Sequence, residues 1–208
     1  MSDWIRRTYD AIGVTQAPPG RHLAALQEPY VGKVLLCIDV SGSMAEYDGG
    51  LVTRLKRVST GAKQFITEAT AANYRVGLVL WNEGVRHHVP LSEDPRAALR
   101  ALRRARSYGG TSILPTLELG IRELGGLTGD RVMAIFGDGD IGPVQPAVEM
   151  ARHAASLGIR IIVRGLGDQA AGALGQLATE EDEQVTIRSA DQLAAGVASM
   201  ISKVTRRR

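Results

Sequence analysis

Apolar runs alternate with amphipathic stretches along most of this 208-residue chain. Short runs rich in Val, Ile and Leu predict buried strands, and apolar positions at helical spacing predict helices between them. The predicted strands are 34–40, 75–81, 85–89, 131–136, 159–163 and, from a weaker pattern, 184–187. The predicted helices are 51–72, 93–107, 113–124, 143–157, 170–178 and 190–204.

This alternation favours an α/β fold, with a doubly wound, mostly parallel central sheet and helices on both faces. The turn Asn82-Glu83-Gly84 is too short for a crossover, so the two strands that it joins should form an antiparallel pair at one edge. We expect an irregular lead-in over 1–30, where Pro18-Pro19-Gly20 breaks any helix, then one domain over 31–204 and a basic tail over 205–208.

Composition narrows the class of protein. The chain is 44% hydrophobic and 23% charged but only 4% aromatic, which indicates a soluble globular protein with an aliphatic core. A net charge of +3 is too small to favour nucleic acid, and no apolar stretch could span a membrane. The single Cys37 lies inside the first strand, and the N-terminal residues lack the apolar middle of a signal peptide. We therefore expect a cytoplasmic protein whose partners are neither nucleic acid nor membrane.

Candidate chemistry lies at the end of the first strand. The segment Asp39-Val40-Ser41-Gly42-Ser43 follows the apolar run 34–38, so one carboxylate and two hydroxyls lie at the carboxyl end of that strand. Ligands of open α/β sheets bind at this edge. Three oxygen side chains beside a flexible glycine can converge on a hard cation such as Mg²⁺.

Two further loops contribute oxygen donors to the same edge. Thr111 follows Gly109-Gly110 between two predicted helices, and Asp138 follows the strand 131–136 between two glycines. Each loop alone is a weak signal, because Asp and Thr often only stabilise turns. The three loops together predict one metal site.

With these residues, the chain resembles the von Willebrand factor A (vWA) domain family from about Lys33 to about Ser202. Asp39-Val40-Ser41-Gly42-Ser43 matches the family's D-x-S-x-S signature, Thr111 its lone threonine and Asp138 its later aspartate. In that family these five residues form a metal-ion-dependent adhesion site (MIDAS). The resemblance implies Mg²⁺, with Mn²⁺ and Ca²⁺ as alternatives. It also implies that the serines bind the metal directly, Thr111 directly or through water, and the aspartates often through water.

The resemblance also implies a function. Neutral hydroxyl ligands leave the metal electron-poor, with a position open to an Asp or Glu of a protein partner. Intracellular prokaryotic members often work beside AAA+ ATPases or in multiprotein assemblies, so we expect a non-enzymatic adaptor.

Other polar residues have two interpretations each. Asp140 could support a metal ligand from behind, although a solvated loop carboxylate is the simpler interpretation. Arg100, Arg103 and Arg104 belong to a basic helix that leads to Thr111. They are either a solvated face or a basic rim that steers an acidic partner toward the metal.

An enzyme is the alternative function. Haloacid dehalogenase phosphatases have D-x-D-G-T and G-D-G-x-N-D motifs, which the segments around Asp39 and Asp138 resemble superficially. Asp39 would then be the nucleophile of a Mg²⁺-dependent hydrolase. However, the general acid of that motif is Ser41 here, and a neutral hydroxyl cannot protonate a leaving group near neutral pH.

Overall fold

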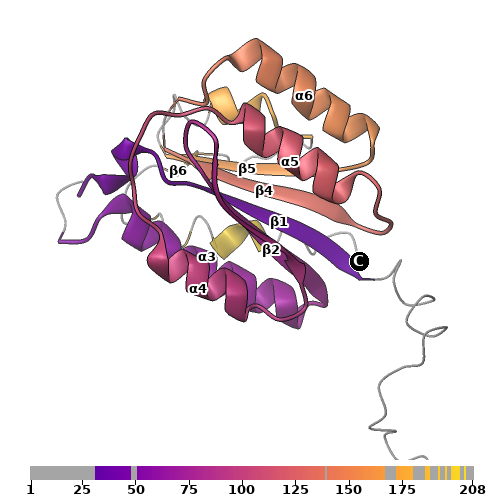
Figure 1. Ribbon diagram of the computed structural model, residues 1–208, viewed down its shortest axis with the longest axis horizontal. Coiled ribbons are helices and arrows are strands. Elements are labelled where there is room, and N and C mark those ends of the chain that lie inside the picture. Colours follow the sequence, from indigo (N-terminus) through magenta and orange to yellow (C-terminus); the bar gives the residue numbers. More distant parts are fainter. Residues whose placement is uncertain are drawn as a thin grey trace, which may run out of the picture.

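The computed structural model describes residues 31–47, 51–138, 140–166, 172–179, 186–187, 192, 195, 198–201 and 204. At its centre, strands β1 (Gly32–Asp39), β2 (Tyr74–Trp81), β3 (Val85–Ser92), β4 (Arg131–Gly137), β5 (Arg160–Leu166) and β6 (Thr186–Ile187) form one sheet. The order across the sheet is β3-β2-β1-β4-β5-β6 (Figure 1).

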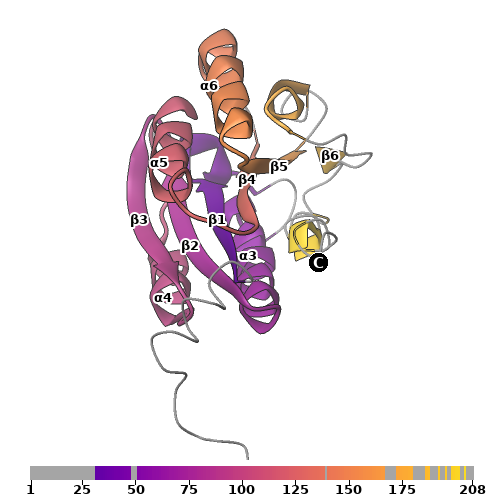
Figure 2. The same cartoon turned by 90° about the vertical axis from the view of Figure 1, so that its right-hand side faces the viewer.

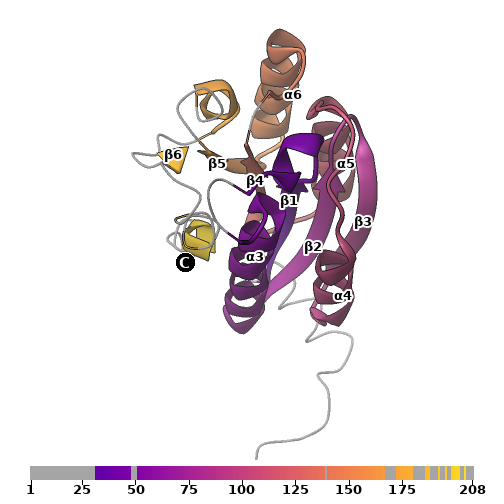
Figure 3. The ribbon, with the colours of Figure 1, turned by 90° about the vertical axis from the view of Figure 1, so that its left-hand side faces the viewer.

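Helices cover both faces of this sheet. Helices α3 (Arg54–Ala71) and α4 (Arg96–Arg104) lie side by side on one face, and α5 (Leu114–Leu124) and α6 (Val144–Ser156) lie on the other (Figure 2, Figure 3). A short 3₁₀ helix, η2 (Gly42–Ala45), follows β1 directly.

The pairing confirms the predicted sheet. β1 runs parallel to both β2 and β4, β5 is parallel to β4 and β6, and β2–β3 is the antiparallel edge pair. The chain builds outward from β1 to β2 and β3, then returns to place β4 on the other side of β1. β1 is therefore the point where the strand order reverses, and its carboxyl end lies where open α/β sheets bind ligands.

The side-chain pattern of β1 explains the two layers. Val34, Leu36 and Ile38 belong to the core under α3 and α4, whereas Leu35 and Cys37 belong to the core under α5 and α6. Since side chains alternate across a strand, a fully apolar run is what a strand covered on both faces requires. Cys37 is fully buried, as expected, and burial raises the pKa of its thiol.

Element boundaries differ from the predictions in several places. The first helix begins at Arg54 rather than 51, because Thr53 is extended and its hydroxyl accepts a hydrogen bond from the Lys56 N–H at 3.3 Å. The turn η2 has no hydrophobic periodicity and was not predicted. Of the predicted helix 170–178, residues 172–175 are helical and 170–171 lie outside the described residues.

The ends of the chain stay predictions. The lead-in 1–30, the tail 205–208 and most of the predicted helix 190–204 fall outside the described residues. Among the residues that are described, no helix is both long and apolar enough to cross a bilayer.

Candidate functional site

Asp39 ends β1 with its side chain fully buried. Its Oδ1 accepts a hydrogen bond from the Ser41 N–H at 2.7 Å, which turns the chain away from the sheet. Its Oδ2 is also buried, and within the described part of the chain it has no hydrogen-bond partner. Gly137 lies beside it on β4, where a Cβ atom would come within 3.6 Å of Oδ2. Any side chain at position 137 would therefore contact this oxygen.

Burial makes the Asp39 carboxylate costly. It raises the pKa of Asp39 from 3.8 to about 7; the hydrogen bond from the Ser41 N–H opposes this shift, and the charge of Asp138 adds to it. A carboxylate with one unpartnered buried oxygen is stabilised only by a cation or a proton. Ionisation of Asp39 at the carboxyl edge of the sheet is therefore unfavourable unless a cation balances it.

A chain of hydrogen bonds links four of the predicted residues. The Oγ atoms of Ser41 and Ser43 are 3.0 Å apart, and Ser43 Oγ donates to Asp138 Oδ1 at 2.8 Å. Ser43 reaches this position because η2 turns the backbone directly after Ser41. Asp138 follows β4, which pairs with β1, so the two loops meet at one edge. The structure therefore brings Asp39, Ser41, Ser43 and Asp138 together.

Arg54 is a member of the site that the sequence did not predict. Its guanidinium donates to Asp138 Oδ2 at 3.0 Å and forms an ion pair with Glu46 at 2.6 Å. The Asp138 side chain is fully buried, so this contact neutralises a carboxylate that water cannot solvate. No sequence signal distinguished Arg54 from the other arginines, since its partner is 84 residues away.

Thr111 lies on a loop that the backbone holds against the site. Gly42 N donates to Gly109 O at 3.0 Å, and Ser112 N donates to Asn82 O at 2.7 Å. Gly109 has φ +80°, and a Cβ there would lie 2.8 Å from Asn82 Nδ2, so only glycine fits. The turn after β2 therefore positions the Thr111 loop, a role that the sequence did not suggest.

The remaining candidates lie at the periphery of these contacts. Asp140 is exposed, and its Oδ1 accepts from the Gly142 N–H at 2.9 Å. Arg103 lines a groove between α3 and α4, whereas Arg100 and Arg104 line a hollow on the opposite side of α4, next to β3. The predicted basic rim is therefore divided between two surfaces.

The donor set suits a hard divalent cation. It consists of hydroxyls and carboxylates, and no group of three His, Cys, Asp or Glu side chains in the described residues could hold a metal by itself. At the site, the Arg54 guanidinium pairs with both Glu46 and Asp138, one cation for two carboxylates, which leaves a net negative charge, and Asp39 is a further acidic group close to Asp138. A divalent cation would balance this charge and supply the partner that Asp39 Oδ2 lacks.

Comparison with known families agrees with this geometry. The von Willebrand factor type A domain profile matches residues 34–140, which is more than half of the chain and includes the D-x-S-x-S segment, Thr111 and Asp138. The chain belongs to the von Willebrand factor type A domain family. Members of this vWA family are generally protein-interaction modules. No curated protein sequence matches the chain.

Solved structures share the vWA fold. The conserved hypothetical protein BatB from Bacteroides thetaiotaomicron is 20% identical, with a TM-score of 0.69 over 84% of this chain and 99% of that one. The SpRpn10 VWA domain is 15% identical, with a TM-score of 0.67 over 82% of this chain and 95% of that one.

A third similar structure carries a metal. It is proximal thread matrix protein 1 from the mussel byssus with a zinc-occupied MIDAS motif, which is 19% identical, with a TM-score of 0.65 over 84% of this chain and 47% of that one. At these identities the three structures establish the fold alone.

Proposed function

We propose that this chain is a divalent-metal-dependent protein-binding module. The observation that carries the proposal is the buried, unpartnered Asp39 Oδ2 beside linked hydroxyls of Ser41 and Ser43 and the carboxylate of Asp138. These groups form the negatively charged, oxygen-rich end of a sheet. The zinc-occupied MIDAS of the mussel protein supports the same kind of site here.

Each residue has a defined task in this proposal. Ser41 and Ser43 would hold the ion through neutral hydroxyls, Thr111 directly or through water, and Asp39 and Asp138 often through water. When bound, the metal supplies an electron-poor centre that accepts a carboxylate from the partner. Arg54 donates to Asp138 Oδ2 and holds that carboxylate in place.

Exposed apolar side chains around these residues support a protein partner. Of the six large hydrophobic residues exposed in the described chain, Tyr47, Leu51, Val52 and Tyr108 belong to segments that carry or contact the site. Tyr108 is 47% exposed, and its N–H donates to Val40 O at 2.9 Å. Aromatic and aliphatic side chains around a charged centre are typical of protein interfaces.

Metal binding is the first test. Isothermal titration calorimetry with Mg²⁺, Mn²⁺, Ca²⁺ and Zn²⁺ should show binding to the wild-type chain that Ser43→Ala weakens at least about tenfold. Asp140→Asn is the matched control, because it removes an exposed carboxylate from the same loop as Asp138. Equal binding by the wild type and Ser43→Ala would reject the metal site.

Partner binding is the second test. We propose a partner that presents Asp or Glu, and an AAA+ ATPase or another subunit of the same system is the first candidate. Pull-downs from native lysate compare the wild type in Mg²⁺, the wild type in EDTA and Asp39→Ala in Mg²⁺. One partner should bind in the first sample and be absent from the other two. If every partner persists, the metal does not bridge the two proteins. The cytoplasmic location expected from the sequence stays a prediction.

A further inference from the structure

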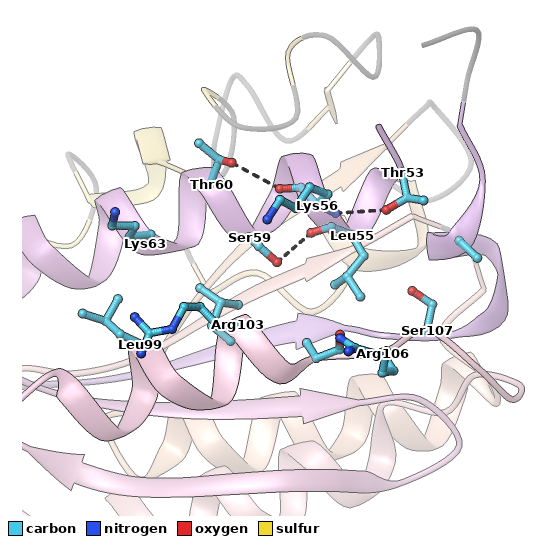
Figure 4. Close-up of a pocket in the computed structure, with 13 residues that line it drawn as sticks. Thr53, Leu55, Lys56, Ser59, Thr60, Lys63, Leu99, Arg103, Arg106 and Ser107 are labelled. Carbon is cyan, nitrogen blue, oxygen red and sulfur yellow. Dashed lines mark hydrogen bonds between the residues drawn. The ribbon is translucent and has the colours of Figure 1, made fainter. Parts of the chain in front are cut away.

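A groove of about 640 Å³ runs between α3 and α4 on the face of the sheet opposite α5 and α6 (Figure 4). Its floor is apolar and includes Leu55 and Leu102, which are 7% and 4% exposed. Leu99 and Ala105 extend this floor along α4. A long apolar floor between two helices has the shape that accepts the apolar side of a helix or extended segment.

Four cationic side chains line the same groove. Lys56 and Lys63 come from α3, and Arg103 and Arg106 come from α4 and the segment after it (Figure 4). Lys56 and Lys63 are seven residues apart on α3, which places them on one side of the helix about 10 Å from each other. Arg103 lies across the groove from this pair.

The groove contains no compensating acid. None of the residues that line it in the described chain is Asp or Glu. The hydroxyls of Ser59 and Thr60 are neutral, and both donate to carbonyl oxygens of their own helix, at 2.7 and 3.2 Å. They add no negative charge to the groove. Glu46, next to the groove residue Ala45, is paired with Arg54. The surface is therefore positive and apolar together.

The groove continues from the metal site. Ala45, the last residue of η2, and Thr53, the N-cap of α3, both line it. Ser43 lies on η2, and Arg54 at the start of α3 holds Asp138.

We infer that this groove binds an acidic, amphipathic segment of the protein partner, next to the carboxylate that reaches the metal. The part of this inference that concerns the metal-bound carboxylate rests on the proposed function, whereas the groove contacts do not. Glu or Asp side chains of the segment pair with Lys56, Lys63 and Arg103, and its apolar side contacts Leu55 and Leu102. Charge complementarity selects an acidic occupant, because a basic or neutral segment would leave the cations uncompensated.

The test uses a fluorescein-labelled, helix-forming peptide of roughly fifteen residues, with Leu on one face and Glu elsewhere. Its anisotropy is measured with the full chain, in Mg²⁺ and in EDTA. The groove variant is Lys56→Gln/Arg103→Gln. The matched control is Arg122→Gln/Arg152→Gln, which removes the same charge from exposed positions on α5 and α6. A peptide with Lys in place of Glu controls for sequence-independent binding.

We expect the groove variant to bind the acidic peptide about three- to tenfold more weakly than the control, in Mg²⁺ and in EDTA alike. This difference should shrink at about 0.5 M salt, because the contacts are solvent-exposed ion pairs. Equal affinity of the two double variants would overturn the inference. So would equally tight binding of the lysine peptide.

Other occupants give distinct results. If the groove variant changes the sedimentation of the protein alone, the groove binds a second copy of the chain. If it lowers the melting temperature without weakening the peptide, the groove holds the chain's own residues. Either result overturns the inference. Loss of peptide binding in EDTA or Ser43→Ala but not in the groove variant rejects the groove and keeps the metal bridge. Loss in the groove variant alone supports the groove, and the metal bridge is then decided by the pull-down with EDTA and Asp39→Ala.

Discussion

The unpartnered charge of Asp39 should make the metal-free protein less stable as the pH rises. In the folded state its pKa is raised to about 7, whereas in the unfolded chain it returns to about 3.8. The folded state therefore binds this proton more tightly than the unfolded state. Asp39 costs no stability below pH 3.8, and the cost grows as the pH rises and is complete above about 7.

The size of this effect follows from the two pKa values. Each unit of difference corresponds to about 1.4 kcal/mol. Between about pH 5.5 and about pH 8.5, the free energy of unfolding should fall by about 2 kcal/mol through this group alone. Asp39→Asn removes the ionisation, so this part of the pH dependence should disappear in that variant.

Urea unfolding in EDTA at the two pH values measures this difference. The wild type and Asp39→Asn are compared because they share every other ionisable group, so the contributions of those groups cancel. Asp140→Asn serves as the control, since Asp140 is exposed and its loss should leave the pH dependence of the wild type unchanged. If Asp39→Asn loses stability with pH as steeply as the wild type, Asp39 is not a buried charge without a partner.

Three further predictions concern the site and the core. Saturating Mg²⁺, at about 100 times its dissociation constant for the wild type, should stabilise the wild type by about 2.7 kcal/mol in calorimetric melting at pH 8.5, and Ser43→Ala should lose about half of this gain or more. An equal gain in both would refute the role of the hydroxyl. Phe65→Ala should cost about 3–5 kcal/mol in urea unfolding, because Phe65 lies on α3 and is fully buried in the core that this helix shares with the sheet. A cost below about 1 kcal/mol would contradict that packing. Tyr74→Phe should cost about 1–3 kcal/mol, since the Tyr74 hydroxyl has one proton to donate and lies 2.6 Å from Asp130 Oδ2 and 2.9 Å from Val204 O, two acceptors that would lose this donor. Unchanged stability would show that water replaces the hydroxyl.

Much of the fold was predictable because burial leaves a local record. The unbroken apolar run of β1 indicated a strand covered on both faces, and the short turn after β2 indicated an antiparallel edge pair. Boundaries were less predictable. The start of α3 depends on the extended backbone of Thr53, and η2 depends on contacts with another loop, neither of which has a periodic pattern.

The candidate site divides in the same way. Asp39, Ser41 and Ser43 are close in sequence and at a strand end, so their proximity was predictable from five consecutive residues. The contact of Ser43 with Asp138 is shown only by the structure, because it spans 95 residues and requires β4 beside β1. The ion pair of Arg54 with Asp138 requires the same arrangement.

By itself, the sequence determined which segments are buried and which side chains lie at the strand ends, because both depend on local order along the chain. Only the tertiary structure decided that Asp39 is a buried carboxylate with a pKa near 7, and that Arg54 neutralises Asp138. It also separated Arg103 from Arg100 and Arg104 onto different sides of α4. Desolvation and ion pairing depend on neighbours from distant segments, and the strand order brings those neighbours together.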